Sequence, residues 1–440
     1  MSSVLIRGGT VLTMNDRLEI VSGDVGIREG RIVALGAVDD DGYDRVVNAG
    51  GALVLPGFVQ THVHLCQTLF RGFADDLALM DWLQRRIWPM EAAHTPSSLR
   101  AAARLAAAEL LATGTTTVLT METVHDTDAV LEAVADTGLR AVIGKCLMDA
   151  DTLAPARLHE PTQAAIDEGL ALKKRWDGAA DGRLHGALAP RFALSCSRDL
   201  LEAVGSLSTT RGILVHTHAS EQQAEIALVE RATGRRNLLY FAEAGLASPH
   251  LCVAHCVWVD DAEQALMAER QVKVLHCPGS NLKLGSGIAP VPELRARGIS
   301  VSLGADGAAC NNRLDMFDEM RLAATLQAMR VGPGRLPARD VVWMATREGA
   351  RALGLHNVIG SLEVGKRADI IVVDIHGAHV APGSDPYSTL VYAARGTDVR
   401  TTLVDGRILV DRGVLQHLDA AEIADTARAE ARALAARAGW

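Results

Sequence analysis

The sequence has no C-x-x-C pair, no basic stripe and no long uninterrupted apolar run. Its seven cysteines are an odd number, and we expect reduced, mostly buried thiols rather than a disulfide framework. The net charge of −9 argues against nucleic acid as a partner. The start, MSSVLIRGGT, lacks the charged and apolar regions of a signal peptide, and Arg104 and Glu109 interrupt the apolar stretch near residues 101–112. These absences predict a soluble cytoplasmic protein without a membrane partner.

The composition is that of a globular protein with room for more than one structural unit. The chain has 440 residues, of which 48% are hydrophobic and 22% are charged. A plain (β/α)8 barrel needs roughly 250 residues, so a second unit is expected beside any barrel.

Strand-like and helix-like segments alternate through the middle of the chain. One helix shows its boundaries plainly, with Thr95 at the N-cap, Pro96 at the first helical position and Gly114 as the stop. Such alternation indicates βα units and a parallel sheet, so the predicted fold class is α/β, a (β/α)8 TIM barrel. The eight candidate strands are 58–64, 115–121, 140–148, 183–191, 212–218, 251–256, 273–278 and 300–306.

The two ends of the chain differ from the middle, because both are patterned as short strands with glycine-rich turns. We expect them to meet in a small β-sandwich domain beside the barrel. The predicted division is residues 1–55 and 366–416 for the two parts of that domain, 56–365 for the barrel and 417–440 for a C-terminal packing helix.

Polar residues that bind metals follow several of the predicted strands. The segments FVQTHVH, GILVHTH, LCVAHC and SVSLGAD end in or near His62, His64, His218, His255 and Asp306. A parallel barrel brings all strand ends to one rim, and H-x-H places two imidazoles on one face of a strand. Imidazole and carboxylate suit a borderline divalent ion, so the sequence predicts a metal-dependent hydrolase.

Each of these residues also has a plainer interpretation. His216 and His218 share one strand end; we choose His218 because Glu221 follows it by three residues. Glu221 is either a first-turn glutamate or a proton shuttle. His255 is either a core histidine, a ligand or a partner of the metal's water, and Asp306 is either a turn former or a ligand that also acts as base.

Two absent motifs narrow the kind of metal site. A site for two metals would place a bridging acid or modified lysine at the end of the fourth strand, and HGALAPRFALSCS has no lysine there. The H-x-E and P-C-x-x-C pattern of cytidine deaminases is also absent. One metal ion is therefore expected.

The ordered motifs PGFVQTHVH, HTHASE, AHC, HCPGSNLKLGSGIAPV, GADGAACNNRLDMFDEM and GSLEVGKRADIIVVD resemble the amidohydrolase superfamily. More narrowly they resemble its mononuclear branch of aminopurine and aminoheterocycle deaminases and s-triazine hydrolases. The resemblance implies a barrel with a small β domain and one divalent metal ion, zinc or sometimes iron. It also implies that His62, His64, His218 and Asp306 bind the metal, that Glu221 and His255 assist, and that Asp306 doubles as base.

Two narrower resemblances concern the substrate. LFRGFADDLALMDWLQRRIWPMEA is similar to methylthioadenosine, S-adenosylhomocysteine and 5′-deoxyadenosine deaminases, in which the glutamate matching Glu91 contacts ribose hydroxyls. KCLMD and APRFALSCS, with Gln67, are similar to guanine deaminases, whose matching glutamine and arginine contact the base. Gln67, Glu91 and Arg191 are therefore candidate substrate-binding residues, with Glu91 and Arg191 facing different parts of a nucleoside. The plainer interpretations are a helix-surface Glu91 and a solvated Arg191.

The predicted function is hydrolytic deamination of an aminopurine by an aminohydrolase that acts on carbon–nitrogen bonds in cyclic amidines. The leading substrates are the 6-aminopurine nucleosides 5′-deoxyadenosine, methylthioadenosine, S-adenosylhomocysteine and adenosine. The alternatives are a guanine-type base deaminase, a triazine amino- or chlorohydrolase, and, from another class, a non-catalytic scaffold. Barrels of this kind often dimerise, so a homo-oligomer is expected.

Overall fold

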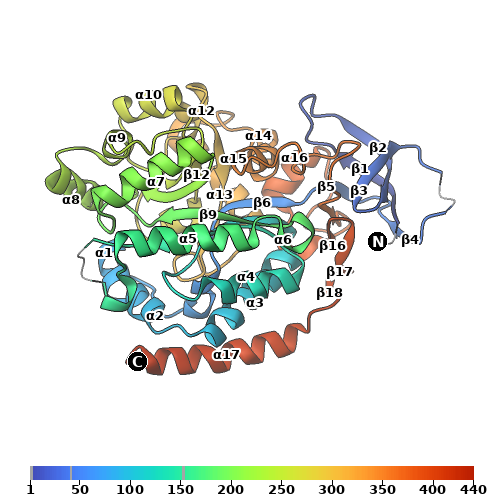
Figure 1. The fold of residues 1–440 in the computed structure, drawn as a ribbon. Coiled ribbons are helices and arrows are strands. Elements are labelled where there is room, and N and C mark those ends of the chain that lie inside the picture. The colour runs from blue at the N-terminus through green and yellow to red at the C-terminus, as the bar shows by residue number, and fades with distance from the viewer. Residues whose placement is uncertain (1–2, 40–41, 151–153) are drawn as a thin grey trace.

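The computed structural model describes residues 3–39, 42–150 and 154–440. Two sheets organise these residues: a parallel sheet wrapped by helices, and a separate mixed sheet built from both ends of the chain (Figure 1). The predicted (β/α)8 barrel with a small β domain formed by both ends is therefore confirmed.

The barrel sheet follows the order β13-β12-β11-β10-β9-β8-β7-β6-β14, with parallel pairing throughout. Its strands are β6 (Phe58–His64), β7 (Thr115–Met121), β8 (Arg140–Leu147), β9 (Leu184–Pro190), β10 (Val215–Ala219), β11 (Leu251–His255), β12 (Lys273–His276), β13 (Val301–Leu303) and β14 (Asp306–Gly307).

The ninth strand arises because the predicted strand 300–306 is interrupted. Val301–Leu303 pairs with β12, whereas Asp306–Gly307 pairs with β6 and so closes the barrel. Gly304 lies between the two pieces, where a Cβ atom would fall 2.7 Å from the backbone nitrogen and oxygen of His62. Only glycine permits this close approach, so the break brings Asp306 beside the histidines of β6.

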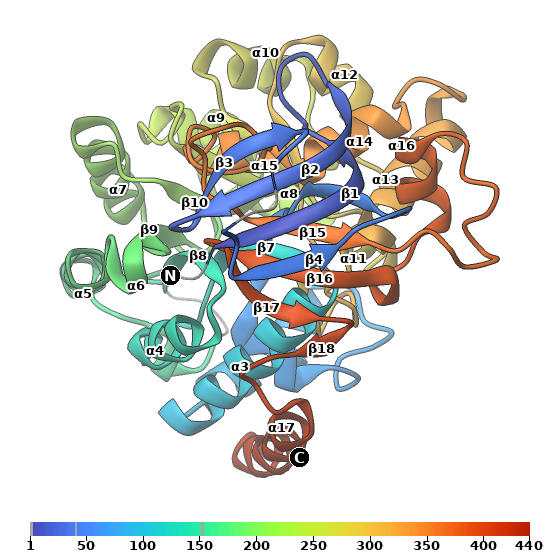
Figure 2. The same cartoon turned by 90° about the vertical axis from the view of Figure 1, so that its right-hand side faces the viewer.

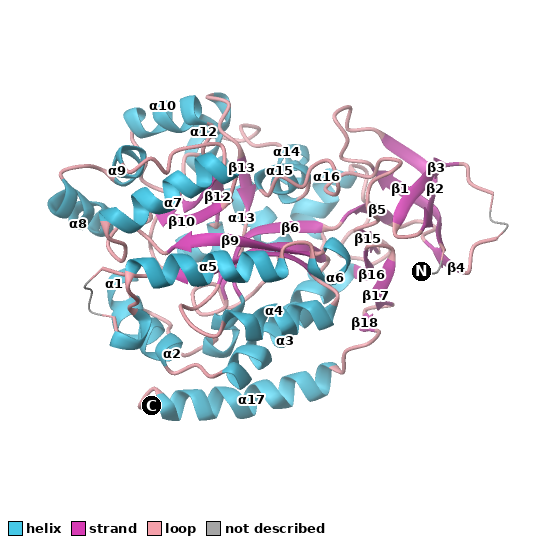
Figure 3. Cartoon of the chain, in the orientation of Figure 1, coloured by secondary structure: helices cyan, strands magenta, loops and turns pink. Residues whose placement is uncertain are grey.

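Helices cover the outside of the barrel (Figure 3). The longer ones are α3 (Pro96–Ala112), α4 (Thr127–Thr137), α5 (Thr162–Trp176), α7 (Arg198–Arg211), α8 (Gln223–Thr233), α9 (Asn237–Glu243), α10 (Asp261–Arg270), α13 (Met316–Val331) and α14 (Ala338–Ala345). Shorter ones are α6 (Ala179–Gly182), α11 (Pro278–Lys283), α12 (Val291–Ala296), α15 (Arg347–Ala352), α16 (Pro386–Ser388), η3 (Ala156–Leu158), η4 (Thr389–Ala393) and η5 (Gly396–Asp398). Between β6 and α3 the chain forms η1 (Leu65–Phe70), α1 (Leu79–Trp82), η2 (Leu83–Ile87) and α2 (Trp88–Ala92).

Helix α3 begins where its sequence predicts. The Thr95 hydroxyl accepts a hydrogen bond from the Ser98 amide at 3.3 Å, and the Ser98 hydroxyl accepts one from the Thr95 amide at 2.9 Å. Pro96 occupies the first turn, and Gly114 lies just beyond the end with φ +88°. Reciprocal capping of this kind satisfies amide groups that a helix start leaves without partners.

The two ends of the chain meet in the second sheet, which faces the viewer in Figure 2. Its strands are β1 (Val4–Leu12), β2 (Ile20–Arg28), β3 (Arg31–Gly36), β4 (Arg45–Asn48), β5 (Leu53–Pro56), β15 (Ile370–Val373), β16 (Val399–Val404), β17 (Arg407–Asp411) and β18 (Val414–Leu415). Antiparallel pairing of β5 with β15 joins the ends, because Leu53 lies opposite Val373 and Pro56 opposite Ile370.

A buried ionic cluster attaches this small β domain to the barrel. Arg140, the first residue of β8, donates to Asp369 at 2.8 and 3.1 Å and to Asp405 at 2.6 Å. All three residues are buried. A charge inside a protein needs an opposite charge nearby. Asp369 directly precedes β15 and Asp405 directly follows β16, so the cluster connects the start of barrel strand β8 to two strands of the small β domain.

The chain ends in a long helix, and its cysteines lie in the interior. Helix α17 (Ala420–Arg437) runs along α3 and buries Ile423, Ala427 and Leu434 (Figure 1). All seven cysteines are free and buried. None of the helices in residues 3–39, 42–150 and 154–440 has the length and apolar character needed to cross a bilayer.

Candidate active site and metal centre

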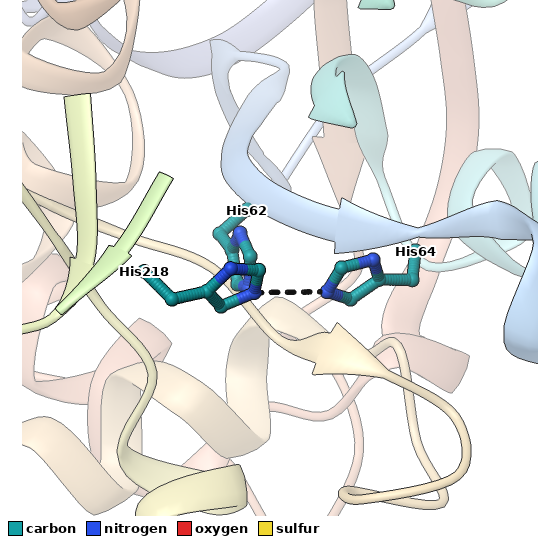
Figure 4. A group of neighbouring side chains, drawn as sticks. All are labelled: His62, His64 and His218. Atoms are coloured by element: carbon teal, nitrogen blue, oxygen red, sulfur yellow. Dashed lines mark hydrogen bonds between the residues drawn. The ribbon is translucent and has the colours of Figure 1, made fainter. Parts of the chain in front are cut away.

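The predicted strand-end residues come together at the C-terminal rim of the barrel. Asp306 Oδ1 lies 3.2 Å from His62 Nε2 and 3.3 Å from His64 Nε2. His64 Nε2 lies 3.3 Å from His218 Nε2, and Figure 4 shows the three imidazoles pointing toward one another. The ligand atoms of His62, His64 and His218 lie within 4.8 Å of one another, as do those of His62, His255 and Asp306.

Local backbone geometry at two strand ends aims these side chains inward. His255 has φ +73° and Asp306 has φ +64°, the left-handed region that non-glycine residues seldom adopt. Such conformations cost about 1–3 kcal/mol each and are found where the surrounding structure holds a functional side chain in place. Both residues therefore leave the regular strand direction at the rim.

The ring nitrogens that face away from the cluster have fixed partners. His64 Nδ1 donates to the carbonyl of Met121, and His218 Nδ1 donates to the carbonyl of Arg191, each at 2.7 Å. A carbonyl only accepts, so in each neutral ring the proton lies on Nδ1 and Nε2 presents a lone pair. Among the described residues, His62 Nε2 is buried without a hydrogen-bond partner.

Burial keeps the three imidazoles neutral. It lowers the pKa of His62, lowers that of His64 to about 3, and holds that of His218 well below its ordinary value. Burial alone would raise the pKa of Asp306, but His62 and its neighbouring histidines hold it well below the usual range. These imidazoles and the carboxylate fall in two overlapping groups of three that share His62, and such donors fit a divalent transition metal.

Glu221 and His255 lie on the substrate side of this cluster. Glu221 Oε1 accepts a hydrogen bond from Ser286 at 3.0 Å, and its Oε2 lies 3.5 Å from His255 Nε2. Burial raises the pKa of Glu221. Burial would lower the pKa of His255, but the carboxylates of Glu221 and Asp306 raise it above its ordinary value. The group is arranged for proton transfer among an acid, a histidine and a carboxylate.

Four polar residues around the site carry no role in the sequence prediction. Ser280 donates to Asp306 Oδ2 at 2.6 Å, and Asn281 Oδ1 accepts from His255 Nδ1 at 2.9 Å. Ser286 holds Glu221, and the Glu225 carboxylate accepts from the Glu221 amide at 3.1 Å. Ser280, Asn281 and Ser286 all lie in the motif HCPGSNLKLGSGIAPV, which was the available signal, but their partners are distant in sequence.

A pocket opens onto the cluster; it holds about 490 Å³ of space free of atoms, including space open to solvent. Leu79, Trp82 and Leu83 line it from the short helices that follow β6, and Phe192 and Leu284 line it from the barrel loops. The polar lining includes His64, His218, Glu221, Glu225, His255, Asp306, Gln67 and Arg191. The wall of the pocket therefore combines titratable side chains with apolar ones.

The three candidate substrate-binding residues form one buried group. Arg191 makes a two-pronged ion pair with Glu91, with Nη2 3.1 Å from Oε1, and Gln67 Nε2 donates to the same Oε1 at 3.0 Å. Gln67 and Arg191 line the pocket, whereas Glu91 does not. Neither charged residue is at the surface, since Glu91 is 2% and Arg191 is 4% exposed. In the structure the two charges are each other's partners, so neither the helix-surface interpretation of Glu91 nor the solvated interpretation of Arg191 holds.

Comparison with known proteins agrees with the fold. The model of the amidohydrolase family matches residues 53–409, which is most of the chain. The chain belongs to the amidohydrolase family.

Two curated relatives of this amidohydrolase match over essentially the whole chain. A 5′-deoxyadenosine deaminase of Methanosarcina acetivorans is 39% identical over 440 residues, covering 100% of both chains. A 5-methylthioadenosine/S-adenosylhomocysteine deaminase of Syntrophobacter fumaroxidans is 39% identical over 439 residues, covering 98% of both. Among solved structures, an adenosine deaminase from Xanthomonas campestris with bound zinc matches with a TM-score of 0.91 and 33% identity, over 98% of each chain.

Proposed function

We propose that this amidohydrolase is a metal-dependent deaminase that releases ammonia from a 6-aminopurine nucleoside such as 5′-deoxyadenosine, methylthioadenosine, S-adenosylhomocysteine or adenosine. The observation that carries the proposal is the cluster of three neutral imidazoles and Asp306, of which His64, His218 and Asp306 line the pocket. The names of the full-length relatives support the choice of substrate.

His62, His64, His218 and Asp306 would hold one divalent ion, zinc or iron. When bound, such an ion lowers the pKa of water and supplies a nucleophile near neutral pH. A single ion is proposed because β9, the fourth barrel strand, has the sequence LHGALAP and offers no lysine to bridge two ions.

The chain's own side chains can carry every proton in the reaction. Asp306 would take a proton from the attacking water as its oxygen adds to the amino-bearing ring carbon. Glu221 would donate a proton to the adjacent ring nitrogen, so that no negative charge accumulates on the ring. Asp306 would then return its proton to the departing amine as the carbon–nitrogen bond breaks, and the added hydroxyl would pass its remaining proton to the Glu221 carboxylate as the ring carbonyl forms. His255, with Nε2 3.8 Å from Asp306 Oδ2, would orient the attacking water.

The positions of these groups are held by bonds that do not depend on substrate. Ser280 holds Asp306, Ser286 holds Glu221 and Asn281 holds His255. A network of this kind keeps donors and acceptors oriented before the reaction, which lowers the cost of reaching the transition state.

The test is a screen in which the metal-loaded protein is mixed with each compound and ammonia release is monitored by ultraviolet absorbance. 6-Aminopurine nucleosides, free aminopurine bases and amino- or chlorotriazines are compared at equal concentration. Turnover of nucleosides with little turnover of bases supports the proposal. A preference for guanine or for a triazine would show that the proposed substrate class is wrong. Absence of both bound metal and ammonia release would favour a non-catalytic scaffold.

A guanine-type base deaminase is the second candidate, and one observation favours it. The Glu91 carboxylate can only accept, so Gln67 turns its Nε2 toward Glu91 and leaves Oε1 buried without a partner among the described residues. Arg191 and Gln67 thus present hydrogen-bonding groups to the pocket that can pair with the ring nitrogens or carbonyl of a base. Parallel assays of guanine and of an adenine nucleoside distinguish the two candidates.

We also propose the division of the chain into residues 1–55 and 366–416 for the small β domain, 56–365 for the barrel and 417–440 for the last helix. The strand and helix bounds support it, since β5 ends at Pro56, β15 begins at Ile370 and α17 begins at Ala420. A cytoplasmic homo-oligomer is proposed as well, and sedimentation of the purified protein tests the oligomer.

A further inference from the structure

One fully buried histidine lies beside the proposed metal-binding residues but is not one of them. His216 lies on β10, two residues before His218, and is 0% exposed. Its Nε2 lies 2.7 Å from His62 Nδ1, and the two rings meet edge to face at 88° with centroids 4.8 Å apart. Its Nδ1 lies 3.3 Å from the carbonyl oxygen of Thr120 on β7. His216 therefore stands behind His62, on the side away from the cluster.

The proton positions along this chain of contacts follow from the chemistry of imidazole. If His62 Nε2 is to offer a lone pair to a metal, its proton must lie on Nδ1 and be donated to His216 Nε2. His216 must then accept at Nε2 and carry its own proton on Nδ1, where it donates to Thr120. The Thr120 carbonyl can only accept, so the direction of the whole relay is determined at that end.

The other two imidazoles of the cluster need no such intermediate. His64 Nδ1 reaches the Met121 carbonyl directly and His218 Nδ1 reaches the Arg191 carbonyl directly, each at 2.7 Å. His62 is the exception, because its outward nitrogen meets a side chain that could exist in either tautomer. The orientation of His62 toward the metal thus depends on a second histidine, which comes from the opposite part of the barrel.

We propose that His216 is a positioning residue that fixes the tautomer and ring orientation of His62 and thereby tunes metal affinity. This inference rests on the metal site of the proposed function and extends it to a residue outside the ligand set. Partners of metal-bound histidines in general contribute roughly 10–100-fold to metal affinity.

The experiment compares two substitutions in the full-length protein. His216→Gln keeps an acceptor for His62 and a donor for Thr120, whereas His216→Met fills a similar volume and has neither. Each metal-free protein is titrated with zinc against a chromophoric chelator at one pH, and thermal unfolding of the same samples reports folding. We expect His216→Gln to bind zinc within about threefold of the unchanged protein and His216→Met to bind roughly 10–100-fold more weakly.

A matched control separates this role from ordinary core packing. His94 is also buried and uses both nitrogens, with Ser98 Oγ at 2.9 Å and the Cys66 carbonyl at 3.1 Å, but it contacts none of the cluster residues. His94→Met should leave zinc affinity unchanged. Zinc affinity in folded His216→Met equal to that of the unchanged protein would overturn the relay and leave the metal site intact. An unchanged protein that binds no zinc would overturn the metal site itself, and the relay with it.

A spectroscopic measurement covers the case in which His216→Met does not fold. Long-range nitrogen–proton spectra of zinc-loaded protein with ¹⁵N-labelled histidine report which ring nitrogen carries the proton, and His216→Gln identifies the His216 signals. The relay requires a protonated Nδ1 in both His62 and His216. A proton on Nε2 of His216 would overturn the proposal.

Discussion

Buried charges at the two ends of the barrel are arranged in opposite ways. At the N-terminal end, donors face acceptors: Arg140 donates to Asp369 and Asp405, and Arg367 lies 3.5 Å from Asp405. At the C-terminal rim, acceptors face acceptors, because the lone pairs of three Nε2 atoms and the oxygens of Asp306 converge. The first arrangement pairs opposite charges within the chain, whereas the second would be stabilised by the proposed cation. The comparison separates a cluster that connects two parts of the fold from one that is proposed to bind a metal ion and carry the reaction.

The largest expected effect is a loss of turnover when Asp306 at the C-terminal rim is replaced. Asp306→Asn removes the proposed base and one ligand, so turnover should fall by about a thousandfold to ten-thousandfold. The metal-free protein should remain folded, because the amide has the same size and its oxygen still accepts from the Ser280 hydroxyl. Steady-state ammonia release and thermal unfolding measure the two quantities. Asp405→Asn is the matched control at the other end, and a comparable loss of turnover there would contradict the comparison.

Breaking the N-terminal cluster should instead affect stability. Arg140→Met leaves two buried aspartates without their main partner, so the free energy of unfolding should fall by about 3–5 kcal/mol. Chemical denaturation measures this change. Metal content and turnover of the folded fraction should stay near those of the unchanged protein. A variant that is fully stable would show that the cluster is not what holds the small β domain on the barrel.

Glu221→Gln sharpens the distinction inside the rim itself, between groups that hold metal and groups that move protons. The amide keeps the size and the Ser286 contact but cannot donate the proton, so turnover should fall by roughly a hundredfold with metal content unchanged. Elemental analysis and initial rates measure the two effects. Glu230→Gln on the outer face of α8 serves as the control, and near-normal turnover in Glu221→Gln would remove Glu221 from the mechanism.

Glu91→Gln tests a buried ion pair at the rim, in which donors face an acceptor. Because Glu91 holds both Arg191 and Gln67, its loss should lower kcat/KM for a nucleoside and for a free base together, by about 1–3 kcal/mol or roughly ten- to a hundredfold. A loss confined to KM of the nucleoside would instead indicate direct contact between Glu91 and ribose hydroxyls. Kinetics on both substrates with the same preparation distinguish these outcomes.

Much of the barrel could be predicted because its elements are local. Strand β6 spans 58–64 and β7 spans 115–121 as predicted, since each is a β-branched run between turn residues. The start of α3 follows from Thr95, Pro96 and the cap that they form. The eighth strand was predicted as one piece and is two, because the break at Gly304 depends on the approach of His62, 242 residues away in sequence.

The sequence by itself determined the fold class, the meeting of the two chain ends and the set of strand-end residues from which the site is built. Periodicity and capping are local properties, and the carboxyl ends of parallel strands meet at one rim whatever the side chains are. Only the tertiary structure decided which atoms pair. It placed Glu91 against Arg191 and His216 behind His62, because a buried polar atom takes whichever partner the packing of distant strands brings within reach, and sequence spacing does not encode that distance.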